Sequence, residues 1–83
     1  MTNKEYNGWK NKASWNVSMW MGNDYGIYLG AVEFMKDYKG KRPYIDFCID
    51  AGLDAQKTPD NFKWCSDNLD YNALNEMMWE LVK

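Results

Sequence analysis

The chain has 83 residues, of which 46% are apolar and 17% aromatic, and its formal net charge is −2. A chain of this length holds a single domain, and the aromatic content excludes an intrinsically disordered protein. The sequence contains no apolar run long enough to span a membrane and no apolar core of a secretory signal near its start. We therefore expect one small globular domain over residues 1–83, with residues 1–8 as a loose tail and the cytoplasm as its compartment.

The absence of histidine narrows the classes of function. Histidine is the commonest general base and the commonest metal ligand, so every catalytic site that pairs a serine or cysteine nucleophile with histidine is excluded. Two cysteines, Cys48 and Cys65, are too few for a structural zinc site, and we expect both to be reduced and at least partly buried. The sequence thus predicts a protein that is not an enzyme and that binds no metal and no cofactor.

Residues 13–21 carry a pattern that fits two kinds of element. Apolar side chains alternate at positions 15, 17, 19 and 21, as in a strand, but the same segment also satisfies helical spacing. We favour a helix because Ser14 could cap its start and the Gly22-Asn23 pair could end it.

Residues 24–38 carry a clearer helical signal. Asp24 can cap the start and Gly40 can close the end, where Lys36 and Lys39 favour the negative pole of the helix. Between them lies a broad apolar face formed by Ile27, Tyr28, Ala31, Val32, Phe34, Met35 and Tyr38. Two glycines inside this helix, Gly26 and Gly30, are expected to admit a close helix neighbour.

The second half of the chain predicts two further helices. Pro43 opens one that ends at Gly52, with Tyr44, Phe47, Cys48 and Ala51 facing inward. Residues 53–69 form a long connection, within which residues 61–65 are either a short strand or an ordered loop anchored by a tryptophan. Asp70 caps the last helix, whose apolar stripe is Tyr71, Leu74, Met77, Met78, Leu81 and Val82. The predicted fold class is mainly α: a compact small bundle of about four helices.

Tryptophan, tyrosine and methionine are more numerous than so small a core can hide. Such side chains anchor protein interfaces, so a protein partner is the leading hypothesis. The candidate contact residues are Trp20, Met21, Tyr25 and Trp79. Asn16, flanked by apolar neighbours, is expected to be buried with its amide bonded to the backbone of another segment.

Two other readings of the sequence remain open. A basic and aromatic segment could bind single-stranded nucleic acid, although the acidic pI of about 4.9 argues against it. Its residues are Lys36, Tyr38, Lys39, Lys41 and Arg42. The ladder of Asp46, Asp50 and Asp54 could support acid–base chemistry, but such spacing is typical of a solvated helix face.

Residues 7–24 carry a further signal, because positions 7–20 read N-G-W-x-N-x-x-S-W-N-V-x-x-W. This motif resembles that of a family of small proteins of bacteriophages, prophages and their hosts, and Ser14 replaces the threonine usual in the family. Residues 58–60 and 69–71 are more loosely similar. The resemblance implies a small, phage-encoded accessory protein that binds and modulates or inhibits a bacterial host protein. It implies no catalytic residue.

Overall fold

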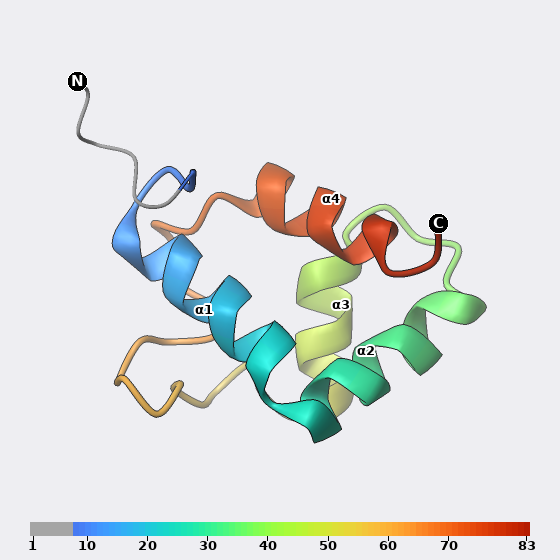
Figure 1. Cartoon of the computed structure of the whole chain (residues 1–83), viewed down its shortest axis with the longest axis horizontal. Helices are drawn as coiled ribbons and strands as arrows, with labels where there is room; N and C mark the ends of the chain where they lie inside the picture. Colours follow the sequence, from blue (N-terminus) through green and yellow to red (C-terminus); the bar gives the residue numbers. More distant parts are fainter. Residues whose placement is uncertain (1–7) are drawn as a thin grey trace.

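The structure, a computed structural model, describes residues 8–83 and contains four α-helices within them (Figure 1). They are α1 (Lys12–Asn23), α2 (Tyr25–Lys36), α3 (Pro43–Ala51) and α4 (Tyr71–Glu80). The predicted small helical bundle is confirmed, and α1 is a helix rather than a strand. The predicted tail lies outside the described residues, except for Gly8.

The N-cap of α1 lies three residues before the predicted one. Asn11 is the N-cap, and its side-chain oxygen accepts a hydrogen bond from the Ser14 backbone N–H at 2.9 Å. Ser14 was therefore wrongly assigned as the cap. Its buried hydroxyl instead accepts the backbone N–H of Asp70 at 2.8 Å, which joins α1 to the start of α4.

A single residue, Asp24, connects α1 to α2. Its backbone N–H donates to the Trp20 carbonyl at the end of α1, and its carboxylate accepts from the Ile27 backbone N–H at the start of α2. The predicted cap is confirmed, but α2 ends at Lys36 and not at Gly40. One residue cannot form a wide turn, so α1 and α2 diverge sharply at this point (Figure 1).

The two glycines of α2 differ in what they face. A side chain at Gly30 would lie against the ring of Phe47 from α3, so Gly30 does admit a close helix neighbour. A side chain at Gly26 would meet only the carboxylate of Asp24, so the expectation of a helix neighbour there was wrong.

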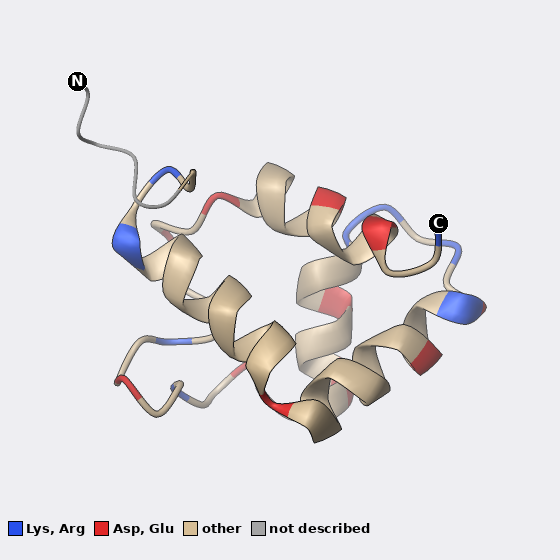
Figure 2. Ribbon diagram, in the orientation of Figure 1, with Lys and Arg blue, Asp and Glu red and all other residues tan. Residues whose placement is uncertain are grey.

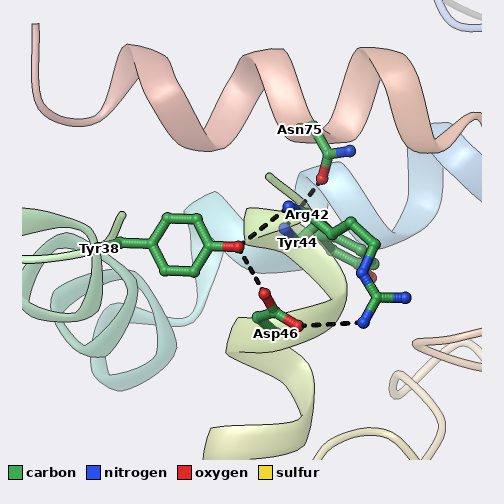
Figure 3. Close-up of polar contacts among 5 residues, drawn as sticks. All are labelled: Tyr38, Arg42, Tyr44, Asp46 and Asn75. Atoms are coloured by element: carbon green, nitrogen blue, oxygen red, sulfur yellow. Dashed lines mark hydrogen bonds and ion pairs between the residues drawn. The ribbon is translucent and has the colours of Figure 1, made fainter. Parts of the chain in front are cut away.

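The helix α3 has the predicted bounds, with Pro43 in its first turn and Gly52 at its end in the left-handed conformation (φ 75°). No side chain of its own caps it. The side chain of Asn75 on α4 accepts the Tyr44 backbone N–H at 3.0 Å and so replaces the missing cap (Figure 3). Ala51 is exposed, which corrects its predicted inward position.

The connection between α3 and α4 is an ordered loop without a regular strand. A single bridge pairs Lys57 with Lys63, and Asn61 turns the chain between them with a φ of 73°. The Trp64 backbone N–H donates to Gln56, and the Trp64 side chain enters the core with 3% of its surface exposed. The predicted alternative of a loop anchored by a tryptophan is therefore the one that the structure adopts.

The core draws on all four helices and on this loop. Its buried apolar residues are Ala13, Val17, Met21, Ala31, Met35, Tyr44, Phe47, Cys48, Leu53, Trp64, Leu69, Leu74 and Met78. Within residues 8–83, none of the helices has the length and apolar character needed to cross a membrane.

Candidate protein-interaction surface

The side chain of Asn16 joins α1 to the loop between α3 and α4. Asn16 is 1% exposed, and its amide nitrogen donates to the Asp60 carboxylate at 2.8 Å. Its amide oxygen accepts from the hydroxyl of Thr58 at 2.7 Å. The predicted burial is correct, but the partners are side chains of the loop rather than backbone groups.

Trp20 contributes to the same contact. Its indole N–H donates to the same Asp60 oxygen at 2.9 Å, and its ring is partly buried against the core. The hydrogen bonds from Trp20 and Asn16 hold the pKa of Asp60 below its usual value. Trp20 therefore has a structural role, and its indole N–H is already engaged within the chain.

This lowered pKa predicts a specific weakening in acid. The ionised carboxylate accepts the two bonds, so their stabilising contribution is present above the unfolded pKa of about 3.9 and is lost as the pH falls through the folded pKa. We expect the urea midpoint of Asp60→Asn to lie below that of the wild type at pH 7 and to converge with it as the pH approaches 3. Trp20→Phe, which removes one donor, should weaken this convergence. Parallel stability curves of the wild type and Asp60→Asn between pH 3 and 7 would contradict the assignment.

The four predicted partner-contact residues do not form one patch. Met21 is 2% exposed and packs in the core, so its assignment to a contact surface was wrong. Tyr25 opens α2, whereas the ring of the exposed Trp79 lies 5.7 Å from that of Tyr38, just beyond the other end of α2. A helix of 12 residues is about 18 Å long, which separates Tyr25 from Trp79.

The structure instead presents an apolar stripe along α2. The outer face of α2, as we call it, consists of Tyr25, Tyr28, Leu29 and Val32, which follow the i, i+3, i+4, i+7 pattern of one helix side. Tyr25 is 73% exposed, Tyr28 38% and Leu29 43%, while Val32 is half-buried. The buried side of the helix is formed by different residues, mainly Ala31 and Met35. Tyr28 and Val32 were predicted as part of the broad apolar face of this helix, and Leu29 was not, although its spacing from Tyr25 and Val32 is visible in the sequence.

The predicted nucleic-acid segment is largely neutralised by neighbouring carboxylates. Lys36 pairs with Glu33 at 2.8 Å, and Arg42 lies 3.6 Å from Asp46. Among the cations of the segment, only Lys39 and Lys41 form no ion pair with the residues that the structure describes. A strip with so few unpaired cations is a weak match for a phosphate backbone.

Tyr38 is also committed to the fold. Its hydroxyl donates to the Asp46 carboxylate at 2.5 Å and accepts the Arg42 backbone N–H at 3.0 Å (Figure 3). Its ring lies between those of Phe34 and Trp79, at 5.2 and 5.7 Å. Burial and the bond to Asp46 raise the pKa of this phenol. The ring is therefore occupied by aromatic neighbours of the chain itself, and Asp46 serves this contact and the pairing with Arg42.

The acidic ladder forms no metal site in the described part of the chain. Asp46 is occupied as above, and no group of three histidine, cysteine, aspartate or glutamate side chains within residues 8–83 could hold an ion. The two thiols are free, as expected: Cys48 is buried and Cys65 is half-buried.

Comparison with known proteins identifies the chain at the level of its family. Residues 2–83 match the family of unknown function DUF7249, and the chain belongs to this family. No curated protein and no solved structure matches the chain.

Proposed function

We propose that this member of DUF7249 is a non-enzymatic binding protein that inserts the outer face of α2 into an apolar groove of another protein. The observation that carries the proposal is the exposed row of Tyr25, Tyr28 and Leu29 along one side of a helix whose opposite side is already packed in the core. A helix that is apolar on both sides is ordinarily buried on both sides. Insertion of such a face into a groove is a common mode of peptide and protein recognition.

The charges around this face indicate the chemistry of the partner. Between residues 13 and 32 the only charged side chain is Asp24. Figure 2 shows that, apart from Lys12 at its start, α1 carries no charge, and that the first two-thirds of α2 are also free of charge. An uncharged surface offers no ion pairs, so the matching surface should be apolar and uncharged as well. Tyrosine is also enriched at interfaces, because its ring is apolar while its hydroxyl group can remain in contact with water.

The size of the face sets a further requirement. Full burial of a large apolar side chain contributes about 1.5–3 kcal/mol, and these three are already partly covered, so together they contribute about 2–5 kcal/mol. A micromolar complex needs about 8 kcal/mol of net binding free energy after the cost of association. The contact must therefore extend beyond the three side chains. The exposed residues Gly22, Asn23 and Gly26 adjoin them at the junction of α1 and α2, where Asp24 is the one charged residue.

The phage-related resemblance of residues 7–24 supports a bacterial host protein as the partner and the bacterial cytoplasm as the place of binding. On this proposal, binding itself modulates or inhibits the host protein. No cofactor or metal takes part.

The proposal can be tested by photocrosslinking in bacterial cells. A photoreactive amino acid at position 25 should give one discrete adduct with a host protein, and Leu29→Glu should abolish this adduct while leaving the urea midpoint unchanged. Ile49→Glu is the matched control, because Ile49 is an exposed apolar residue on α3, outside the outer face of α2.

Three outcomes would contradict the proposal. The first is an adduct that survives Leu29→Glu, and the second is one that Ile49→Glu removes equally well. The third is an adduct of twice the chain mass, which would identify a second copy of the chain as the occupant. Binding of single-stranded DNA that weakens steeply with salt would instead support the basic segment as the functional surface.

A further inference from the structure

Two cysteines that are 17 positions apart in the sequence meet in the fold. Cys48 lies on α3 and is fully buried, whereas Cys65 lies in the loop before α4 and is half-buried. Neither forms a disulfide, and Cys65 packs against the core cluster to which Cys48 belongs. Each thiol also influences the pKa of the other, as expected for close neighbours. The outer-face proposal uses neither of them.

Hydrogen bonds on both sides of the two cysteines hold the loop that carries Cys65 against α3. The buried hydroxyl of Tyr44, one helical turn before Cys48, donates to the carbonyl of Trp64 at 2.6 Å, and Trp64 directly precedes Cys65. On the other side, the Leu53 backbone N–H donates to the Cys48 carbonyl at 2.8 Å. With the Trp64 side chain in the core, these bonds fix the loop against α3 at the position of the thiols.

We propose that Cys48 and Cys65 form an oxidisable pair that closes to a disulfide when the chain meets a small-molecule disulfide such as oxidised glutathione. The half-buried Cys65 reacts first: its thiolate attacks one sulfur of the small disulfide, and a mixed disulfide and one small thiol result. The thiolate of Cys48 then attacks Cys65 Sγ and releases the second small thiol. Two protein thiols are oxidised, one small disulfide is reduced to two thiols, and the protons of the cysteines pass to the released thiolates.

Burial sets the rate of this reaction. It raises the pKa of both thiols, so little thiolate is present near neutral pH and the exchange is slow rather than immediate. The second step is favoured because the fold already holds the resolving thiol beside the first. The product would join α3 covalently to the loop that carries Thr58 and Asp60, and hence to the contact with α1.

The full-length chain incubated with oxidised glutathione and quenched with acid tests the proposal by mass spectrometry. We expect the loss of two hydrogen atoms per chain and a peptide pair linked through Cys48 and Cys65. Cys48→Ala should stop at the mixed disulfide on Cys65, and the oxidised wild type should unfold at a higher urea concentration than the reduced form.

Titration with mixtures of reduced and oxidised glutathione shows whether the fold itself favours the disulfide between Cys48 and Cys65. The folded chain should close its disulfide at a glutathione ratio at least about tenfold more reducing than the chain in concentrated urea, because only the fold holds the thiols together. Equal ratios in the two states would overturn the proposal. A mixed disulfide on wild-type Cys65 that never resolves, or disulfide-linked dimers in place of the internal bond, would do the same.

Discussion

The variant Asn16→Asp should be destabilised by about 3–5 kcal/mol at pH 7, close to the change seen when a buried charge lacks a partner. The replacement keeps the shape of the side chain but puts a carboxylate where the amide nitrogen now donates to Asp60 at 2.8 Å. Two carboxylates in contact repel, and the 1% exposure of the site leaves almost no water to solvate the new charge. Urea unfolding followed by circular dichroism measures the effect.

The dependence of this effect on pH gives it a clear signature. Burial and the neighbouring Asp60 raise the folded-state pKa of the new carboxyl group above its unfolded value of about 3.9. The destabilisation should therefore be small below pH 4, where the protonated acid can donate to Asp60. It should grow as the pH rises from the unfolded pKa of about 3.9 to the higher folded-state pKa. Asn72→Asp, on an exposed position in the first turn of α4, is the control and should leave the stability within about 0.5 kcal/mol of the wild type. A loss at Asn16→Asp that does not change between pH 3 and 7 would refute the like-charge explanation.

The variant Trp64→Ala should lose about 3–5 kcal/mol of stability, as expected when a buried tryptophan leaves a cavity. Trp64 is the one tryptophan within residues 8–83 that is fully in the core, and its backbone is bonded to both Gln56 and Tyr44. A chain of 83 residues has a total stability of about 4–12 kcal/mol, so this loss removes a large share of it and should lower the unfolding temperature by more than about 10 °C. Thermal unfolding followed by near-ultraviolet circular dichroism would show it.

Trp79→Ala is the matched control, since Trp79 is exposed on α4 and its ring contacts Tyr38 from the outside. Its loss should cost about 1 kcal/mol, comparable to one aromatic pair. If the two variants unfold at the same temperature, the loop before α4 is not anchored by Trp64 in the way that its burial indicates.

The bounds of the helices were largely within reach of the sequence, because caps and apolar periodicity act over a few residues. Asp24, Pro43, Gly52 and Asp70 each have the predicted place at a helix end. The error at Ser14 has a physical cause: Asn11 offers an equally good capping side chain one turn earlier, and Ser14 is needed to bind Asp70, 56 positions away.

Which residues form a candidate surface depends on which sides of the helices pack together. Caps and apolar periodicity within one helix do not determine this packing. Both sides of α2 are apolar, so only the approach of α1 and α3 shows that Tyr25, Tyr28 and Leu29 face outward. For the same reason Met21, with a side chain typical of interfaces, proved to be part of the core.

A small helical domain without histidine chemistry, most of its helix ends and the burial of Asn16 were all readable from the sequence. Three other features came only from the packed structure: Asn16 bonds to Thr58 and Asp60, Trp64 anchors the long loop, and Cys65 packs against the core cluster that contains Cys48. The reason is the distance along the chain. Capping and periodicity are settled by neighbours within one or two turns, whereas these contacts join residues far apart in sequence and form only when the helices pack around one core.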